Sequence, residues 1–296
     1  GASITTTGSA TGQILLKATQ DVFISNGTNT TTRNALTTAS SPITLWSNAD
    51  ANGNGVVQLG DFTKLASNGG AITLAGGSSA TESSPTAFAV GYGTTNFRGV
   101  TLGLNQAAGN VDLLSGGGDI LIKGYTAANV NWANGVTITN GTTINSGTGT
   151  IAIYGTTSGA GSTTSSMGVE VSGGGAVSTT TITSANTTSS AIVINANSRS
   201  SAGANAWGFN SSNNSGVNLA TISATGTGGG VQIYAATDSS STVSSLVLSH
   251  VNILAKGAIV LDGGGKNIQL TSGSSSDANT IGGANSGDCV GGITLR

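Results

Sequence analysis

Charged residues are scarce in this sequence: they make up 7% of 296 residues, and the formal net charge is −2. An average soluble protein has roughly 25% charged residues. A nucleic-acid-binding protein needs a basic face that neutralises phosphates. The 9 lysines and arginines are too few and too scattered to form such a face, so we expect no nucleic-acid partner.

Proline, cysteine and long apolar runs are also nearly absent. The two prolines, Pro42 and Pro85, exclude a collagen-like or proline-rich disordered chain. Cys289 is the single cysteine, which excludes an intrachain disulfide and leaves an inert buried thiol or an intermolecular crosslink. No apolar run approaches the roughly 18 residues of a membrane helix, so no membrane span is predicted. No signal peptide precedes Gly1, and both ends resemble cuts through a longer pattern.

Glycine, serine and threonine are abundant, with 48 glycines. These residues have low helix propensity, and no apolar stripe with a helical period persists. Disordered chains combine low hydrophobicity with high net charge, whereas the mean hydropathy here is +0.14. β-branched residues among many turn formers therefore indicate an all-β protein.

Short apolar alternations bounded by glycine recur along the chain. Examples are 69-GGAITLAGG-77, 149-GTIAIYG-155 and 257-GAIVLDGGG-265. Two apolar residues lie two positions apart in each unit, so they share one face of a short strand. One such strand buries little by itself, but strands stacked on successive coils bury their apolar pairs in a continuous core.

These units recur without a fixed period, which argues against propellers and strictly periodic repeats. We therefore predict an all-β fold, a right-handed parallel β-helix (β-solenoid), as a single domain over residues 1–296. Val, Ile and Leu are expected to fill the lumen, Gly and Asn to form the corners, and Ser and Thr to cover the outside. The spacing of the units predicts about a dozen coils, stacked ~4.8 Å apart. The polar segments 26–41, 155–166 and 197–216 are predicted to be loops extruded from the rod.

A family resemblance runs along nearly the whole chain and is clearest over residues 43–155, in the strand–turn units 43-ITLWSNADANGNGVVQL-59, 66-ASNGGAITLAGG-77, 99-GVTLGL-104, 109-GNVDLLSGGGDILIKG-124 and 135-GVTITNGTTINSGTGTIAIYG-155. They resemble the repeat regions of bacterial filamentous-haemagglutinin-like exoproteins, which include two-partner-secretion adhesins and autotransporter passengers. The resemblance implies a secreted or cell-surface filamentous protein, often a small part of a very large chain. The amino-terminal secretion domain expected of such exoproteins is not apparent, which leaves the export route open.

The segment 47-SNADANGNGVVQLGDF-62 offers a candidate metal site. Calcium loops of the EF-hand type place oxygen ligands at positions 1, 3, 5, 7, 9 and 12, with glycine at position 6. Only two of the matching side chains are charged, and a strand pattern rather than a helix precedes them. We therefore favour a structural Asn/Gly turn over a weakly bound calcium ion between Asp50 and Asp61. The matching residues are Asp50, Asn52, Asn54, Val56 (through its carbonyl), Gln58 and Asp61, with Gly55 as the glycine.

Catalytic patterns are weak. His250, the only histidine, lies in 246-LVLSHVNIL-254, where alternation predicts a plain surface residue on the polar face or at a strand end. No G-x-S-x-G nucleophile motif occurs. The carboxylates are single and scattered, unlike the paired carboxylates of glycoside hydrolases or the clustered aspartates of pectate-lyase-type β-helices. We predict that the protein is not an enzyme, and we assign no catalytic, cofactor-binding or metal-binding residue. The carboxylates are Asp21, Asp50, Asp61, Glu82, Asp112, Asp119, Glu170, Asp238, Asp262, Asp277 and Asp288.

Two other features indicate binding surfaces. Trp46, Trp132 and Trp207 lie beside predicted turns, where an exposed aromatic ring can stack on a sugar, although tryptophan more often packs a loop onto a scaffold. The triplets Thr137-Ile-Thr139 and Thr181-Ile-Thr183 fit the threonine ladders of ice-binding β-helices, but most units lack them.

The sequence therefore favours a structural rod or stalk segment of a secreted or cell-surface filamentous adhesin that stacks end to end and displays its loops. Since no amphipathic helix caps either end, the expected partners are neighbouring copies or further segments of the same chain. The alternatives are a module that binds host or environmental glycans or another surface, less favoured an ice-binding module, and least favoured a polysaccharide-cleaving enzyme.

Overall fold

The computed structural model describes residues 1–7, 12–79, 81, 83–103, 110–139, 141–158, 165–172, 179–199, 206–212, 220–238, 243–271, 279–283, 285 and 288–296. Within these ranges every element is a β-strand. The strands form three sheets, here named A, B and C, and enter them in rotation along the chain; β9 is an addition to sheet B. All pairings within the sheets are parallel, as in β12 with β15.

Over the described residues, sheet A has nine strands: β1 (Ser3–Thr5), β4 (Asn34–Thr37), β7 (Thr63–Ala66), β11 (Asp112–Leu114), β14 (Thr143–Asn145), β17 (Thr181–Ser184), β20 (Ala220–Ala224), β23 (Val251–Ala255) and β26 (Thr280–Gly282). Sheet B has ten in the same ranges: β2 (Ile14–Lys17), β5 (Ile43–Ser47), β8 (Ile72–Gly76), β12 (Ile120–Thr126), β15 (Ile151–Thr157), β18 (Ile192–Ser198), β21 (Val231–Thr237), β24 (Ile259–Asp262) and β27 (Ile293–Leu295), with β9 (Ala89–Gly91) beside β12. Sheet C has eight, counted likewise: β3 (Val22–Ile24), β6 (Val57–Leu59), β10 (Val100–Leu102), β13 (Val136–Ile138), β16 (Val169–Ser172), β19 (Phe209–Ser212), β22 (Leu246–Ser249) and β25 (Ile268–Thr271).

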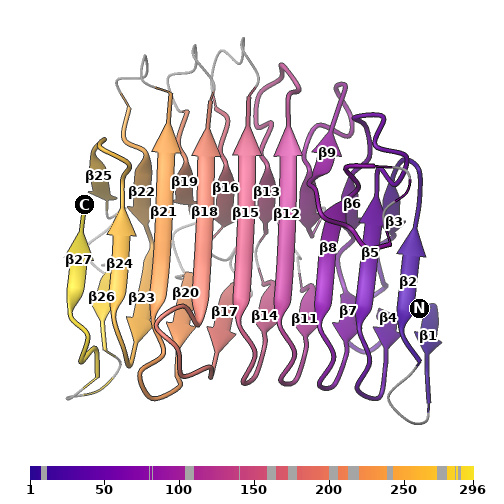
Figure 1. Cartoon of the computed structure of the whole chain (residues 1–296), viewed down its shortest axis with the longest axis horizontal. Coiled ribbons are helices and arrows are strands. Elements are labelled where there is room, and N and C mark those ends of the chain that lie inside the picture. Colours follow the sequence, from indigo (N-terminus) through magenta and orange to yellow (C-terminus); the bar gives the residue numbers. More distant parts are fainter. Residues whose placement is uncertain are drawn as a thin grey trace.

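The coils wind in a right-handed sense. In Figure 1 the chain ascends through sheet B at the front, returns behind through sheets C and A, and advances from the N-terminal end at the right to the C-terminal end at the left. The predicted right-handed parallel β-helix is therefore confirmed, with three faces. The prediction of about a dozen coils was too high, because the sheets contain eight to ten strands each over the described residues.

Columns of aliphatic side chains fill the lumen. Burial alternates along the longest strands of sheet B, so every second residue of β15 and β18 points inward and is buried. Parallel pairing in register places each inward residue on its equivalent in the next coil, which makes one continuous core out of short strands. One such column contains Ile14, Ile43, Ile72, Ile120, Ile151, Ile192, Val231, Ile259 and Ile293.

Hydroxyl groups line one inner corner, so the prediction that serine and threonine cover the outside was wrong in part. Where sheet A turns into sheet B, Ser67 Oγ donates to the Gly70 carbonyl at 2.5 Å and lies 3.3 Å from the Ser115 carbonyl of the next coil. Ser146 repeats the first contact with the Gly149 carbonyl at 2.6 Å. These hydroxyls supply a hydrogen-bond donor to the buried carbonyls of Gly70 and Gly149 at the corner. The column contains Thr38, Ser67, Ser115, Ser146 and Ser184.

Glycine and asparagine form the sharp corners, as predicted. Asn48 and Asn68 have left-handed φ angles of 48° and 49°, a conformation that asparagine tolerates better than most residues. Gly155 is required for another reason, because a Cβ there would collide with the Gly168 carbonyl at the corner between sheets B and C. Sheets B and C therefore approach closely enough at this corner to exclude a side chain.

One segment leaves the coil and folds back on it. After β8 the chain runs from residue 77 to residue 99 before β10, and on this path it adds β9 to sheet B. Antiparallel bridges from Gly76 to Ala87 and from Gly55 to Val90 fasten this excursion to the rod. The sequence prediction placed no loop here.

The predicted extruded loops are only partly loops. Segment 26–41 contains β4, segment 155–166 begins inside β15, and segment 197–216 contains the end of β18 and all of β19. Their remaining parts include residues 159–164, 200–205 and 213–216, which lie outside the described residues.

Candidate functional surfaces

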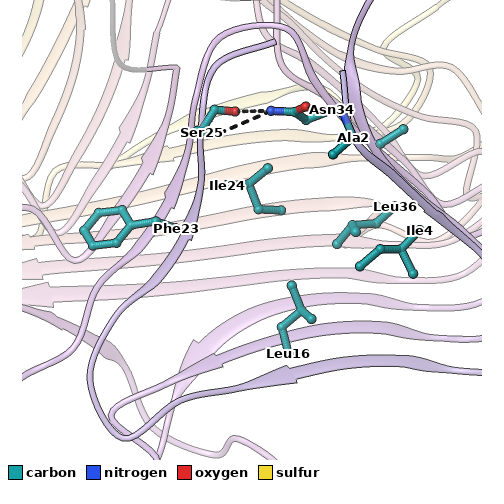
Figure 2. Close-up of a pocket in the computed structure, with 9 residues that line it drawn as sticks. Ala2, Ile4, Leu16, Phe23, Ile24, Ser25, Asn34 and Leu36 are labelled. Atoms are coloured by element: carbon teal, nitrogen blue, oxygen red, sulfur yellow. Dashed lines mark hydrogen bonds between the residues drawn. The ribbon is translucent and has the colours of Figure 1, made fainter.

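The N-terminal end of the rod is open. A hollow of about 240 Å³ lies at this end. Figure 2 shows Ile4, Leu16, Ile24 and Leu36 gathered around it. Asn34 borders it, and its amide nitrogen donates to the Ser25 carbonyl at 2.7 Å. Ile4, Leu16 and Ile24 are the first members of lumen columns over the described residues.

The C-terminal end exposes the last members of the same columns. Leu295 is 59% exposed, whereas its neighbour one coil back, Leu261, is fully buried. The same contrast separates Leu270, at 56% exposure, from the fully buried Leu248. These exposed residues are aliphatic like the buried residues of the columns that they continue.

Backbone groups are also unpaired at both ends. In the part of the chain that the structure describes, β1, β2 and β3 pair with strands on one side only, as do β25, β26 and β27. Each free edge presents a row of N–H and C=O groups that templates a further strand. The two ends are therefore complementary in polarity, since every sheet runs parallel throughout.

The predicted calcium segment forms a turn followed by a strand. The exposed Asp50 carboxylate accepts the Asn52 side-chain amide at 3.0 Å, and Asn52 Oδ1 accepts the Asn54 N–H at 3.1 Å. These local bonds are those of Asx turns. Strand β6 follows, and Asp61 is buried beyond it. Among the described residues no group of three or more His, Cys, Asp and Glu side chains could hold a metal ion, and calcium binding at this loop stays a prediction.

His250 occupies a corner rather than the surface. It lies between β22 and β23, at a strand end as predicted, but it is only 6% exposed, so the prediction of a surface histidine was wrong. Its φ of 55° turns the chain from sheet C into sheet A. Its Nδ1 lies 2.7 Å from Ser249 Oγ, and its carbonyl accepts the Ala220 N–H at 2.9 Å.

Most carboxylates occupy separate places, but three, Asp112, Glu170 and Asp21, are held in polar clusters that the sequence did not reveal. Asp112 pairs with Arg33 at 2.9 Å and faces Lys64 on the neighbouring strand. Burial raises the pKa of the Asp112 carboxyl, and the charges of Arg33 and Lys64 oppose that shift. Glu82 and Asp277 lie outside the described residues.

Glu170 forms the second cluster on the outer side of sheet C, where it is buried. It accepts the Asn134 side-chain amide at 2.7 Å, and that amide also lies 3.1 Å from Thr137 Oγ1. Burial lowers the pKa of the nearby Arg98 guanidinium, against the favourable charge of Glu170. Arg98 Nε in turn donates to the Trp132 carbonyl at 3.3 Å. The cluster fastens the segments that lead into β10 and β13 to the outside of the sheet.

Asp21 holds the excursion between residues 77 and 99 against the rod. Its Oδ2 accepts the Tyr92 hydroxyl at 2.6 Å and the Asn96 amide at 3.0 Å, while Oδ1 accepts the Val56 N–H at 2.9 Å. The hydrogen bond to Asp21 raises the pKa of the Tyr92 hydroxyl above its ordinary value. We call these three side chains the Asp21 latch. No sequence pattern marks it, because its members lie far apart along the chain.

The latch is expected to open at high pH. Because the folded state raises the Tyr92 pKa, the latch contributes fully below the ordinary tyrosine value of about 10 and is lost as the pH rises through the higher folded value. Ultraviolet titration of wild type against Tyr92→Phe should isolate one tyrosine that titrates late, and Asp21→Asn should bring that transition back toward the ordinary value. A Tyr92 transition that Asp21→Asn leaves unchanged would contradict this assignment.

The three tryptophans have different environments. Trp46 is buried beneath Lys17, whose Nζ lies 3.8 Å from the ring centre, and Trp207 is half-buried before β19. Trp132 is 44% exposed. On the outer face of sheet B, Tyr154 and Tyr234 occupy the same column two strands apart. Of the three tryptophans, therefore, Trp132 alone is exposed, while Tyr154 and Tyr234 are half-buried on the outer face of sheet B.

The threonine pairs proposed for ice binding do not share one exposed face. Thr137 and Thr139 are buried in sheet C. Thr181 and Thr183 lie half-buried in sheet A, where Thr181 stacks between Thr143 and Thr221. The ladder expected of an ice-binding face is therefore interrupted in sheet C.

Cys289 is a half-buried free thiol near the C-terminal end. Its φ is 60°, and its Sγ lies 3.6 Å from the Gly292 carbonyl. The residue packs against the margin of the core, so it is less deeply buried than an inert core thiol.

The comparisons with known proteins identify no relative. No protein-family model matches the chain, no curated protein is significantly similar to it, and no solved structure matches it. None of the described segments forms a helix long and apolar enough to cross a bilayer. The arguments for function therefore come from the rod, its two open ends and its outer surface.

Proposed function

We propose that this chain is a structural, non-enzymatic rod or stalk segment that stacks end to end. The observation that carries the proposal is the pair of open ends: each presents aliphatic lumen residues and unpaired strand edges, and the two ends have opposite polarity. A contact between unlike ends of identical units is heterologous, and it generates an open filament when the units stack along one axis and no ring closes.

Within this proposal the rod is part of a secreted or cell-surface filamentous adhesin and displays its outer segments away from the surface. The strand–turn units that resemble filamentous-haemagglutinin-like exoproteins support that setting. The mechanism is mechanical: continuous hydrogen-bonded ladders along three faces make a stiff scaffold, and neighbouring copies or further segments of the same chain are its partners. The scaffold requires no cofactor.

Negative-stain imaging across a concentration series tests the stacking. We expect wild-type rods to lengthen with concentration, and Leu16→Asp to abolish the lengthening, because Leu16 faces the N-terminal hollow. Leu15→Asp is the matched control, since Leu15 is 44% exposed on the neighbouring, outward position of the same strand. Short particles of one size at every concentration of wild type would refute the proposal.

A second candidate function is glycan binding along the rod. It is favoured by the exposed Trp132 and by Tyr154 and Tyr234, which face outward about two strand spacings, or ~10 Å, apart. Between them lies Asn195, whose side-chain amide has no hydrogen-bond partner among the described residues. Aromatic rings beside an outward-facing amide suit the apolar faces and hydroxyls of sugars. Glycan-array binding that Tyr154→Ala and Trp132→Ala abolish would support it, and an array without any bound glycan would exclude it.

A further inference from the structure

Sheet B has the widest outer face of the rod over the described residues. Its strands β12, β15, β18 and β21 are 7 residues long, and they pair in register over their full length. In Figure 1 these strands lie side by side at the front of the rod. Because the pairing is parallel and in register, outward residues of successive coils form straight rows along the rod axis. This face can therefore contact a ligand that runs along the rod.

One of these rows alternates aromatic rings with an amide. Tyr154, Asn195 and Tyr234 occupy it on consecutive coils, and we call these residues the tyrosine tract. The strands that carry the two tyrosines are separated by two strand spacings, ~9.6 Å. All three side chains are half-buried, so each keeps part of its surface accessible. The tract thus combines two ring platforms at a fixed spacing with a hydrogen-bonding group midway between them.

The ring of Tyr234 is held in place before any ligand binds. Its hydroxyl donates to Gln232 Oε1 at 3.0 Å, and Gln232 Nε2 donates to the Ser189 carbonyl at 2.9 Å. Gln232 lies two positions earlier on the same face of β21, so the ring leans along the strand over the sheet. Ala152 is the equivalent neighbour of Tyr154, and its small side chain leaves room for that ring to lean the same way. A ring that is fixed before binding loses little conformational entropy when a ligand stacks on it.

The tyrosine tract carries no carboxylate or ammonium group, and charged side chains mark the two ends of its row. Lys123 lies at one end, where its Nζ donates to the Thr86 carbonyl of the excursion at 2.5 Å. Asp262 lies at the other end, where its Oδ1 accepts the Gly264 N–H at 2.8 Å. Both charges are therefore engaged by the chain itself. A ligand that matches the tract is uncharged.

We infer that the tyrosine tract binds an extended, uncharged β-1,4-linked glycan that runs along the rod axis with one sugar per coil. The inference rests on glycan binding, the second candidate function proposed above. In such a glycan consecutive rings are rotated by half a turn, so every second ring presents the same face, and the disaccharide repeat is close to two strand spacings. Tyr154 and Tyr234 then stack on equivalent faces of alternate sugars, and Asn195 hydrogen-bonds hydroxyls of the sugar between them. An α-1,4-linked glycan coils, so it does not hold two rings at this spacing.

Isothermal titration calorimetry of the full chain with cellohexaose, chitohexaose and maltohexaose tests the inference. We expect a β-1,4-linked probe to bind at least about tenfold more tightly than maltohexaose, its α-1,4-linked counterpart. The tighter of cellohexaose and chitohexaose identifies whether the sugars carry acetamido groups. Tyr154→Ala and Tyr234→Ala should each weaken binding at least about tenfold, since each removes one stacking platform. Tyr125→Ala is the matched control, because Tyr125 is a half-buried tyrosine on the same outer face but outside the tract.

A double variant tests the spacing itself. Asn195→Tyr with Tyr234→Asn keeps the composition of the tract but places the two rings on adjacent coils, so binding should weaken about tenfold. Circular dichroism verifies that each variant keeps the fold.

Four outcomes would overturn the inference and leave glycan binding in place. They are wild-type affinity in the double variant, equal affinity for maltohexaose, no binding of either β-1,4-linked probe, and binding that depends on Trp132 but on neither tyrosine of the tract. An array without any bound glycan would exclude the second candidate function as well.

Discussion

Replacing Ile194 with alanine is expected to lower the free energy of unfolding by about 2–5 kcal/mol. Ile194 is fully buried in β18 and lies between Ile153 and Ile233 of the adjacent coils. Its truncation removes apolar burial and leaves a cavity in a column whose neighbours are held in register by the ladders on both sides. Because backbone pairing fixes the spacing of the coils, the column cannot collapse to fill that cavity. Chemical denaturation followed by circular dichroism measures the change.

Val193→Ala is the matched control for this prediction. Val193 precedes Ile194 in the same strand, has similar size and β propensity, and points to the outer face, where it is half-exposed. We expect Val193→Ala to lower the free energy of unfolding by less than about 1 kcal/mol, as is usual for a partly exposed position. If both variants lowered the free energy of unfolding equally, the lumen column would not be what stabilises the rod.

Substituting valine for Gly155 is expected to destabilise the rod by about 3 kcal/mol or more, at the upper end of overpacking effects. A Cβ at this position would meet the Gly168 carbonyl and a methyl group of Val169, so both sheets would have to move apart at the corner. The carbonyl belongs to the backbone and cannot rotate away as a side chain could. A lower thermal midpoint, or loss of soluble protein, is the expected result.

Thr156→Val provides the comparison at the same corner. Thr156 follows Gly155 in β15, points outward and is half-exposed, so the same side chain is introduced without the collision. This variant should unfold as wild type does. A Gly155→Val protein that unfolds like Thr156→Val would mean that sheets B and C are not in close contact at this corner.

The fold could be predicted from the sequence because its signal is local and repeated. Pairs such as Ile151/Ile153 and Ile259/Leu261 reveal a strand with one apolar face, and their irregular spacing excludes most other repeat folds. The parallel pairing of Ile151 with Ile120 and Ile192 then follows from stacking. The number of coils was overestimated, because each coil contributes several apolar strands. Val100 and Leu102 lie on sheet C, and Leu113 lies on sheet A of the same coil.

The inner hydroxyl ladder was missed, although a signal for it exists. Ser115 follows the inward Leu113 by two positions, and Ser146 follows the inward Ile144 in the same way. Alternation therefore places these hydroxyls inside, and only the expectation that polar residues face solvent placed them outside. These hydroxyls can be buried because each donates a hydrogen bond to a carbonyl at the corner.

The polar clusters could not be predicted from the sequence. Asp21 and Tyr92 meet only because the excursion after β8 folds back toward an earlier coil, and Glu170 meets Asn134 only across neighbouring coils. The distance along the chain between such partners varies with every insertion.

The short connections between sheets A and B, described above as a hydroxyl-lined corner, also determine where the chain can grow. From β4 to β24 these connections stay compact while the others vary in length, so insertions gather along the two remaining edges. Successive attachment points on one edge are separated by only ~4.8 Å, far less than the width of a folded loop. At attachment points this closely spaced, small and uncharged residues such as glycine and serine are the ones that neighbouring coils can accommodate side by side.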